Sequence, residues 1–544
     1  MQSFDAIVIG AGFSGISQLY QLRQLGLSVK LFEKAADVGG VWYWNQWPNA
    51  TSDTPSEVYR FSWDKEDLLT YPWPTHVLPQ KETQAYMNHV VERHNLRPHM
   101  QFSSELKSAA FDNSDSKWTI QFSSGETYKT TYLVLATGRF NKIAFPSIPG
   151  KEKFAGEQYH TGRWNEHRDL KGKRVGLIGT GSSGAALLVG LAKEVKQLVS
   201  FQRSAQYVIP NNNSPVSAEY RDNVNKNYDE FFKNVRGCGV GSGFAPVPAD
   251  YTTFSVSEEE RERVFEAAWN HVWGLAFTFD TFSDIMTNEA ANRELVKYFR
   301  KKITQIVKDP VKRDKLLPPP ETLYDKRPVC SSGYYEAFNQ DNVDIVNYKK
   351  TPWVAITEKG IQTTEKEYEL DVIIYATGYE SDGTWADIDI TGPDGTKLSE
   401  HWAEGSTSYL GLVKAGFPNL FFVIGPQSSL ANIPQHSQFH GEMIVKLISK
   451  AEQMKKEEAA AANKNNTVLI DATQQAEDDW VKLCNAVIQQ TVYYGGGSYF
   501  FSDYNTPRKP KSGRHVLWFM GGFDKYVEKV EEAVGAYRGF TFVH

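Results

Sequence analysis

Short apolar runs alternate with amphipathic helical patterns along much of this 544-residue chain. The runs at residues 6–9, 29–32 and 198–201 have the length and β-branched content of buried parallel strands. Residues 1 to about 140, and again about 150 to 210, therefore follow the strand–helix–strand order of an α/β fold.

The pattern changes between about residue 216 and residue 320. Residues 257–269 and 291–299 are helical in period, and Pro318-Pro319-Pro320 ends the stretch. We therefore expect a helical insertion at 216–329 within a second domain. The domain boundaries that we expect are 1–140 with 385–544 for the first domain, and 150–215 with 330–380 for the second.

Two apolar runs end in the same tripeptide, Ala-Thr-Gly, at residues 136–138 and 376–378. Each marks a point where the chain passes from one domain to the other. Residues 420–426 read as a late strand that returns to the first domain. The low-complexity residues 454–464 predict an exposed helix end, and Gly495-Gly496-Gly497 with residues 506–511 predicts a mobile loop.

A GxGxxG motif follows an apolar run twice, each time at the start of a helical pattern. Its glycines permit a tight turn, close approach of the backbone to a pyrophosphate, and close packing of helix on strand. The phosphates then lie on backbone N–H groups at the helix N-terminus. The two copies predict two dinucleotide sites, at Gly10, Gly12 and Gly15 and at Gly179, Gly181 and Gly184.

The residues at the ends of the following strands distinguish the two sites. Glu33 stands where a carboxylate binds a ribose hydroxyl, so the first site suits FAD, with NAD as the weaker choice. Arg203 stands at the matching point of the second site, where a guanidinium suits a 2′-phosphate. Lys326 is a second candidate for that phosphate, so the second site should prefer NADPH to NADH. Hydride transfer between the two cofactors makes a redox enzyme the leading hypothesis.

The composition excludes several other classes of protein. A net charge of −6 and a pI near 6.1 argue against nucleic-acid binding, and no apolar run approaches the ~18 residues of a membrane span. The three cysteines form no CxxC pair, and the strand pattern begins too early for a secretory leader, so we expect a cytoplasmic protein. His436 and His440 have a spacing found in metal sites but no accompanying third ligand, so we expect no metal.

Between the two glycine motifs lies FxGxxxHxxxW, formed by Phe154, Gly156, His160 and Trp164. This arrangement resembles the fingerprint of the flavin-dependent Baeyer–Villiger monooxygenases. Residues 40–45, 62–66, 202–207 and 326–328 are similar to the cyclohexanone monooxygenase branch. The resemblance implies two Rossmann-like dinucleotide-binding domains with a helical insertion. It also implies an NADPH- and FAD-dependent enzyme in which a peroxyflavin attacks a ketone, and the tetrahedral adduct rearranges to an ester or lactone.

The resemblance also implies roles for particular residues. Arg327 is the expected catalytic donor to the developing oxyanion, and Asp53 holds it in place. The bridge residues couple the two domains, although for Trp164 a packing role is as probable as a direct one. Besides the six motif glycines, the expected cofactor-binding residues are Phe13, Ser14, Glu33, Gly40, Val41, Trp42, Asp53, Tyr59, Leu106, Thr180, Ser182, Ser183, Arg203, Ser204, Lys326 and Arg327. The expected substrate pocket contains Leu430, Ala431, Ile433 and Tyr499.

The chain departs from the family pattern at several places. Asn165 follows the bridge Trp where Pro or Asp is usual, and Trp47-Pro48-Asn49 replaces the usual run on the flavin side. Tyr499 stands in place of a Trp, and Leu430 and Ala431 in place of Phe and Thr. These changes bear on the substrate range more than on the chemistry. We expect the aromatic residues at 42, 44 and 47 to pack around the flavin.

Two other functions stay open from the sequence. One is a sibling monooxygenase that oxidises amine nitrogen or sulfide sulfur, which would use a protonated hydroperoxide and would not need Arg327. The other is a flavin-binding redox sensor without turnover. Arg327 and two intact glycine motifs favour a ketone monooxygenase over both.

Overall fold

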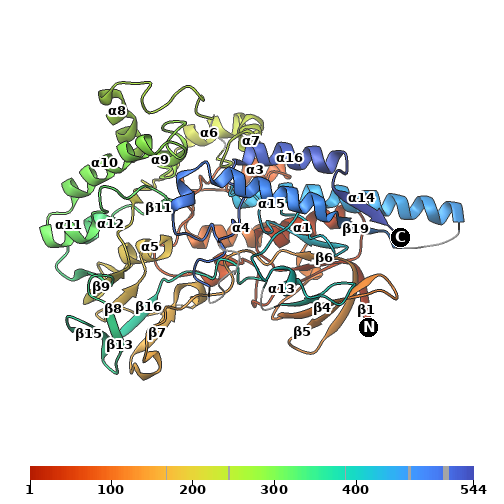
Figure 1. Ribbon diagram of the computed structural model, residues 1–544, viewed down its shortest axis with the longest axis horizontal. Coiled ribbons are helices and arrows are strands. Elements are labelled where there is room, and N and C mark those ends of the chain that lie inside the picture. Colours follow the sequence, from red (N-terminus) through yellow and green to blue (C-terminus); the bar gives the residue numbers. More distant parts are fainter. Residues whose placement is uncertain (167, 243–245, 386–387, 463–466, 507–513, 544) are drawn as a thin grey trace.

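The molecule is built from two halves, one organised around a mixed sheet and the other around a parallel sheet. The computed structural model describes residues 1–166, 168–242, 246–385, 388–462, 467–506 and 514–543. In Figure 1 the first sheet lies to the right with the N-terminus, and the second sheet lies to the left. This arrangement confirms the predicted α/β fold with two dinucleotide-binding domains.

The first sheet has the strand order β17-β4-β5-β6-β1-β2-β3, and β18 pairs with β6. Its central strands are buried on both faces, as a sheet covered by helices requires. The late strand at 420–426 was predicted correctly, since β18 returns to this sheet beside β6. The strands are β1 (Gln2–Ile9), β2 (Val29–Phe32), β3 (Met100–Gln101), β4 (Leu106–Asp112), β5 (Lys117–Phe122), β6 (Thr127–Leu135), β17 (Asp389–Thr391) and β18 (Leu420–Phe422).

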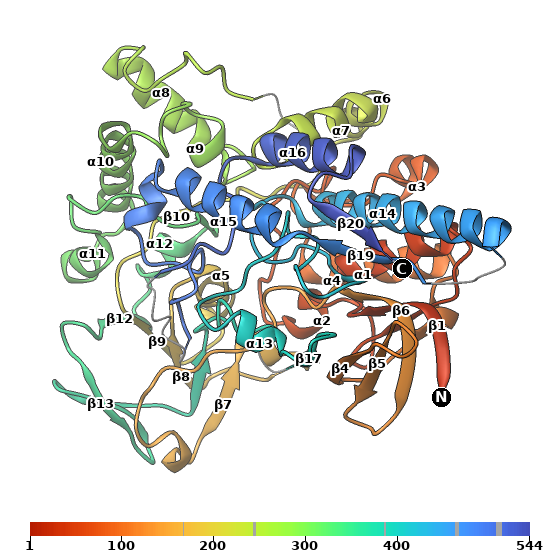
Figure 2. The same ribbon diagram turned by 45° about the vertical axis from the view of Figure 1, so that its right-hand side comes forward.

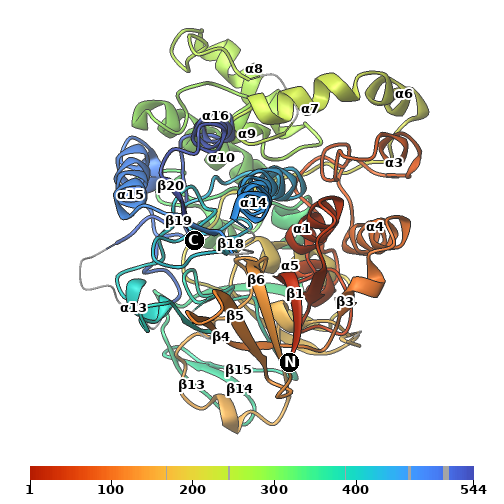
Figure 3. The same ribbon diagram turned by 90° about the vertical axis from the view of Figure 1, so that its right-hand side faces the viewer.

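Two long helices cover one face of the first sheet. The helix α1 (Phe13–Gln24) follows the first glycine motif and packs beside α14 (Ile433–Ala462), as Figure 3 shows. The low-complexity stretch forms the end of α14 as far as Ala462, and residues 463–464 lie outside the described residues. The C-terminal helices α15 (Gln474–Ile488) and α16 (Phe523–Gly535) complete this half.

The second sheet has the order β12-β9-β8-β16-β7, and all its neighbouring strands are parallel. Its helix α5 (Ser182–Leu191) begins directly after the second glycine motif. The strands are β7 (Glu157–His160), β8 (Arg174–Ile178), β9 (Gln197–Gln202), β12 (Val343–Asn347) and β16 (Val372–Tyr375). A small antiparallel sheet of β13 (Trp353–Ile356), β14 (Gly360–Thr363) and β15 (Glu367–Glu369) extends this half outward.

The two halves are joined by a pair of chain segments that run side by side. One leaves β6 after the first Ala-Thr-Gly, and the other leaves β16 after the second. The Ala144 N–H donates to the Gly378 carbonyl at 2.9 Å, and Glu380 N–H donates to the Lys142 carbonyl at 2.9 Å. The two crossovers therefore form a short hydrogen-bonded ribbon, here called the crossover ribbon (residues 141–144 and 377–380).

The insertion leaves and re-enters the second half at neighbouring points, because β10 (Val208–Ile209) pairs with β11 (Val329–Cys330). Its helices divide between the halves, as Figure 2 shows. The helices α6 (Ala218–Lys226) and α7 (Tyr228–Gly237) pack against side chains of the first half. The remaining helices pack on the second core, namely α8 (Glu258–Trp269), α9 (Ala276–Phe279), α10 (Glu289–Ile306) and α11 (Pro310–Leu316).

Further helices and a terminal hairpin belong to the fold. They are α2 (Val41–Trp44), α3 (Lys65–Thr70), α4 (Gln80–Arg93), α12 (Tyr334–Ala337), α13 (Leu398–His401), and a terminal hairpin of β19 (Leu469–Ala472) with β20 (Phe540–Val543). Within the residues that the structure describes, no helix is both long enough and apolar enough to span a bilayer.

Candidate functional site

The first glycine loop leaves no space for side chains at its turn. Gly10 adopts a φ of +107°, and a Cβ there would lie 2.5 Å from the Ala136 carbonyl oxygen. A Cβ on Gly15 would collide with the Gly10 carbonyl, and one on Gly40 would lie 3.0 Å from the Gly12 Cα. The bare backbone around Gly12 and Gly40 at the start of α1 is a cradle that fits a pyrophosphate.

Glu33 ties the end of β2 to this cradle. Its carboxylate accepts hydrogen bonds from the backbone N–H groups of Ala11, at 2.6 Å, and Ala35, at 2.7 Å. The side chain is buried, and burial raises its pKa although both N–H groups favour the charged form. Glu33 therefore lies against the glycine loop, where the sequence places a ribose-binding acid.

The other residues expected around the first cofactor divide between two cores of the first half, with Phe13 and Tyr59 in one and Leu106 in the other. Ser14 hydrogen-bonds Ser437 of α14 at 3.0 Å, and the Trp42 indole N–H donates to the Tyr59 hydroxyl at 3.3 Å. Phe13 packs edge-on against the Tyr59 ring. Val41 is exposed, and Leu106 is buried at the start of β4.

The second glycine loop repeats the backbone geometry of the first. Gly179 has a φ of +106°, and a Cβ there would collide with the Ala376 carbonyl. A Cβ on Gly184 would collide with the Gly179 carbonyl, whereas Gly181 faces open space. Thr180 is buried in this turn, and Ser182 and Ser183 begin α5.

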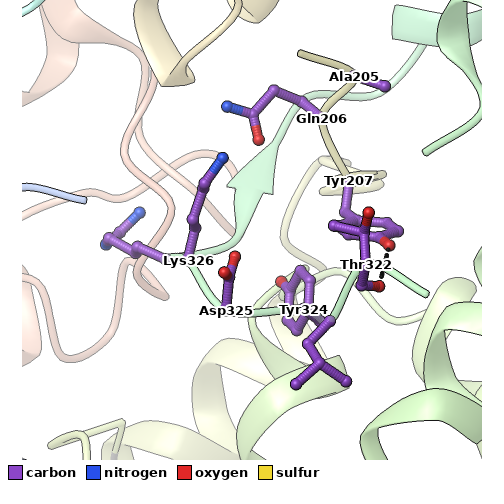
Figure 4. Close-up of a pocket in the computed structure, with 9 residues that line it drawn as sticks. Ala205, Gln206, Tyr207, Thr322, Tyr324, Asp325 and Lys326 are labelled. Carbon is purple, nitrogen blue, oxygen red and sulfur yellow. Dashed lines mark hydrogen bonds between the residues drawn. The ribbon is translucent and has the colours of Figure 1, made fainter. Parts of the chain in front are cut away.

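A charged hollow of about 500 Å³ opens beside the second loop. Arg203 and Lys326 lie in it, and burial and the nearby charges of Arg203 and Lys349 lower the pKa of Lys326. Figure 4 shows a smaller pocket next to this hollow, in which Lys326 and Asp325 lie on one segment opposite Gln206 and Tyr207 on the other. The residues that line the hollow are Arg203, Ser204, Thr322, Asp325, Lys326, Lys349, Gly497, Ser498, Asp503, Tyr504 and Arg514.

Arg327 and Asp53 form an ion pair that links the two halves. An Arg327 Nη1 lies 2.6 Å from an Asp53 carboxylate oxygen, and both side chains are about a quarter exposed, at 25% and 27%. Burial alone would lower the pKa of Arg327, but Asp53 and Tyr499 raise it well above its ordinary value. The structure thus brings together the two residues that were expected to carry the chemistry.

Tyr499 lies within the electrostatic reach of this pair. Burial raises the pKa of its hydroxyl, and the charges of Arg327 and Asp53 act on it in opposite directions. Its ring contacts Phe140 at 5.6 Å and Trp518 at 6.4 Å between centroids. The segment that begins α14, with Leu430, Ala431 and Ile433, packs half-buried against the same core.

The bridge motif joins β7 of the second sheet to the flavin-side loop. The Trp164 N–H donates to the Trp44 carbonyl at 2.8 Å, and the Gln46 N–H donates to the Trp164 carbonyl at 2.8 Å. Gly156 is packed against the Asp371 carbonyl and the Phe154 ring, which leaves no space for a Cβ. The motif therefore lies directly between the two halves.

His160 contacts both strands of the crossover ribbon. Its Nδ1 accepts the Gly162 N–H at 3.0 Å, so the proton of the neutral ring is on Nε2. Nε2 lies 3.3 Å from both the Ala144 carbonyl and the Thr377 hydroxyl. Burial lowers the pKa of His160 to about 4, so the ring is neutral at physiological pH.

The three tryptophans of the flavin-side loop, residues 41–49, have separate partners among the protein's own residues. Trp42 contacts Tyr59, Trp44 lies under the Arg163 guanidinium at 5.0 Å, and Trp47 is buried in the core of the second half. The unusual Asn49 reaches the second half too, because its side-chain amide donates to the Ala186 carbonyl at 3.0 Å. This loop therefore fastens the halves together as much as it surrounds one site.

The two histidines with metal-like spacing face each other inside the first core. His436 Nε2 lies 3.0 Å from His440 Nε2, and the latter lies 2.6 Å from the Tyr526 hydroxyl. His440 Nδ1 accepts the Ile424 N–H, so both ring nitrogens of His440 are already used. Within the described part of the chain, no group of three or more His, Cys, Asp or Glu residues is arranged to hold a metal.

The structure adds residues to the site that were not predicted from the sequence, and four of them are charged or aromatic residues next to predicted ones. Lys349 and Arg514 line the charged hollow, and Arg139 and Trp518 lie beside Tyr499. Lys349 lies in the loop after β12, and Arg514 follows residues 507–513, which are outside the described residues. The only available signal was the position of Arg139 directly after the first Ala-Thr-Gly.

Comparisons with known proteins agree with this geometry. Residues 5–235 match the family model "FMO-like: Flavin-binding monooxygenase-like". A phenazine N-monooxygenase from Lysobacter antibioticus is 40% identical over 541 residues, covering 99% of this chain and 96% of that protein. Cyclohexanone 1,2-monooxygenase from an Acinetobacter species is 38% identical over 542 residues, with coverage of 99% and 96%.

Solved structures give the same result over the full length. Cyclohexanone monooxygenase from Rhodococcus sp. Phi1 bound to NADP+ matches with a TM-score of 0.94 at 39% identity, covering 99% of both chains. A complex of OTEMO with FAD and NADP matches with a TM-score of 0.89 at 30% identity and the same coverage. The present chain belongs to the flavin-binding monooxygenase-like family and, within it, to the Baeyer–Villiger monooxygenases.

Proposed function

We propose that this protein uses NADPH, FAD and O2 to insert one oxygen atom beside a ketone carbonyl, giving an ester or a lactone. The observation that carries the proposal is the Arg327–Asp53 ion pair, which lies where the two dinucleotide-binding halves meet. The full-length similarity to ketone monooxygenases supports it.

The glycine loops and their strand-end residues fit the two cofactors. Gly12 and Gly40 present bare backbone at the N-terminus of α1, and Glu33 lies against the same loop. We assign these residues to the pyrophosphate and ribose of FAD. The second loop repeats the backbone geometry of the first. In place of a carboxylate such as Glu33, the second site has the cations Arg203 and Lys326, which suit the 2′-phosphate of NADPH.

Arg327 supplies a fixed positive charge at the proposed reaction centre. When bound, reduced FAD supplies the two electrons that activate O2. The guanidinium of Arg327 stays protonated throughout, so it stabilises negative charge on oxygen without itself giving up a proton. Asp53 fixes the orientation of Arg327 and partly offsets the cost of its burial.

The bridge residues and the crossover ribbon hold the two halves in register. Trp164 hydrogen-bonds the flavin-side loop through its backbone, and His160 contacts both strands of the ribbon. We assign Phe154, Gly156, His160 and Trp164 to this coupling. We assign the substrate pocket to Leu430, Ala431, Ile433 and Tyr499. All four pack against the first hydrophobic core, and the Tyr499 ring also contacts Trp518 of that core.

A second function has a specific observation in its favour. The relative that is 40% identical is named a phenazine N-monooxygenase, so oxidation of an aromatic ring nitrogen is the alternative. A nitrogen lone pair attacks the oxidant directly and forms no oxyanion next to a carbonyl carbon. This reaction therefore makes no use of a fixed cation such as Arg327.

Three free cysteines, Cys238, Cys330 and Cys484, are all buried. Unpaired thiols are typical of a reducing compartment, which supports our proposal of a cytoplasmic location. Identification of the intact protein in fractionated cells of its source would test that location.

The purified protein, supplied with FAD, NADPH and O2, should be incubated separately with cyclohexanone and with phenazine. Mass spectrometry with labelled O2 should find one labelled oxygen in a lactone from cyclohexanone. Phenazine N-oxide with no lactone from any ketone would establish the alternative. NADPH oxidation without either product would contradict both.

A further inference from the structure

Among the residues that the structure describes, Arg139 is a buried cation without a counterion. It follows the first Ala-Thr-Gly at the end of β6 and is only 7% exposed. The Nη1 of Arg139 donates a weak hydrogen bond to the Gly425 carbonyl at 3.4 Å. The Nη2 of Arg139 is fully buried and has no hydrogen-bond partner among the described residues. A guanidinium in this state normally has a carboxylate beside it.

Aromatic rings surround Arg139 instead of acids. Its guanidinium carbon lies 4.3 Å from the centre of the Trp518 ring and 5.4 Å from that of Trp385. Among the described residues, no carboxylate oxygen lies within the 4.0 Å of an ion pair. Asp382 attracts Arg139 from farther away, and its oxygens accept from the Ser406 N–H and hydroxyl.

Arg139 nevertheless carries its charge at neutral pH. Burial lowers the pKa of Arg139 to about 10, which is still far above neutrality. Contacts with aromatic faces replace only part of the hydration that a buried cation loses. The free Nη2 therefore points to a missing negatively charged partner.

The position of Arg139 relates this missing partner to the reaction site. The charges of Arg139 and of Arg327 both act on the hydroxyl of Tyr499. The Tyr499 ring also contacts Phe140, next to Arg139, and Trp518, on which Arg139 stacks. The charges of both arginines thus reach Tyr499, a residue that we assign to the substrate pocket, and Arg139 lies on the aromatic cluster that holds it.

We propose that Arg139 binds a carboxylate of the substrate, so that the preferred substrate is a keto acid rather than an uncharged ketone. This inference rests on the proposed ketone oxygenation and specifies its substrate class. Arg327 would serve the reacting carbonyl, and Arg139 would hold the carboxylate at the other end. A guanidinium offers parallel N–H donors that match a carboxylate in both charge and planar geometry.

The test uses 4-oxocyclohexanecarboxylate and its methyl ester, which differ in charge but share the reacting ketone. The kcat/KM for lactone formation is measured for both compounds with the native enzyme, Arg139→Leu and Arg139→Lys. The native enzyme should prefer the carboxylate by at least tenfold. In Arg139→Leu this ratio should fall at least tenfold, mainly through KM, and Arg139→Lys should retain part of it.

Flavin content and the rate of NADPH oxidation, measured on the same samples, separate a cofactor role from a substrate role. Equal native activity on both compounds would overturn the inference. So would an Arg139→Leu variant that keeps the native ratio, or one that loses flavin and both activities together. If the native enzyme oxygenates neither of these two compounds nor cyclohexanone, the proposed oxygenation itself fails.

Discussion

The two glycine loops share one backbone design but differ in what lies beside them. In both, the first and third glycines of the motif are packed against carbonyl groups so closely that a Cβ has no space. Beside the first loop is Glu33, buried and bonded to the loop itself. Beside the second is the exposed Arg203 at the edge of an open hollow of about 500 Å³.

This difference indicates how each site works. A closed site whose polar groups are preorganised suits a cofactor that stays bound through many turnovers. An open site with several cations attracts a charged ligand that enters and leaves in each cycle. We therefore propose that the same motif serves a resident cofactor in one half and an exchanging one in the other.

The largest expected effect comes from filling the first loop. In Gly15→Ala the new methyl group would collide with the Gly10 carbonyl, where only backbone atoms could shift. We expect a loss of stability of ~3 kcal/mol or more and a protein that no longer retains FAD. The matched control is Gly181→Ala, because nothing lies within 4 Å of a Cβ there. A yellow Gly15→Ala protein with native thermal stability would contradict the close packing that we describe.

Removing the strand-end cation should change the choice of coenzyme. Arg203→Ala loses the guanidinium beside Lys326 in the charged hollow, so the KM for NADPH should rise roughly 10- to 100-fold. The KM for NADH should change little, because NADH has no 2′-phosphate. Steady-state kinetics with both coenzymes check this, and an equal rise for both would show that Arg203 only supports the fold.

The contact between the halves should depend on pH through His160. Its folded pKa of about 4 lies below the ordinary 6.5, so its contribution to stability is complete above pH 6.5. As the pH falls towards 4, the unfolded chain binds the proton first, and about 2 kcal/mol of stability is lost at pH 5. Unfolding curves give the loss of stability between pH 7 and pH 5 for each protein. This loss should be about 2 kcal/mol smaller in His160→Gln than in the native protein. An identical pH dependence in both proteins would rule out His160 as the source.

A smaller effect is expected from Lys349, at the rim of the hollow. This exposed cation lowers the pKa of Lys326 through its charge, so Lys349→Ala should weaken NADPH binding by roughly two- to fivefold. Its neighbour Lys350 is exposed too but does not line the hollow, so Lys350→Ala is the control. Equal KM values for NADPH in the two variants would exclude Lys349 from the site.

The local parts of this molecule could be predicted from the sequence, and the contacts between distant segments could not. The strand at Val29–Phe32, both glycine turns and the helix at Glu258–Trp269 follow from short-range patterns. The docking of α6 and α7 on the first half, and the separate partners of Trp42, Trp44 and Trp47, depend on tertiary packing.

For the charged residues too, a role could be predicted from a motif but not from a contact between distant segments. Arg203 and Arg327 occupy motif positions, so the sequence indicates a role for each. Arg139 differs from a surface arginine only through its burial against Trp385 and Trp518, which lie far along the chain. No periodicity in the sequence reports such a contact.

The central claim is that Arg203, beside the second loop, selects the coenzyme, whereas the positive charge of Arg327, where the halves meet, stabilises the negative charge on oxygen during the oxygen transfer. The direct test is the ratio of ester or lactone formed to NADPH consumed, measured at saturating NADPH in Arg327→Ala and in Arg203→Ala. We expect a near-native ratio for Arg203→Ala. For Arg327→Ala we expect a ratio at least about a hundredfold lower, with hydrogen peroxide accounting for the NADPH. A near-native ratio in Arg327→Ala would contradict the account.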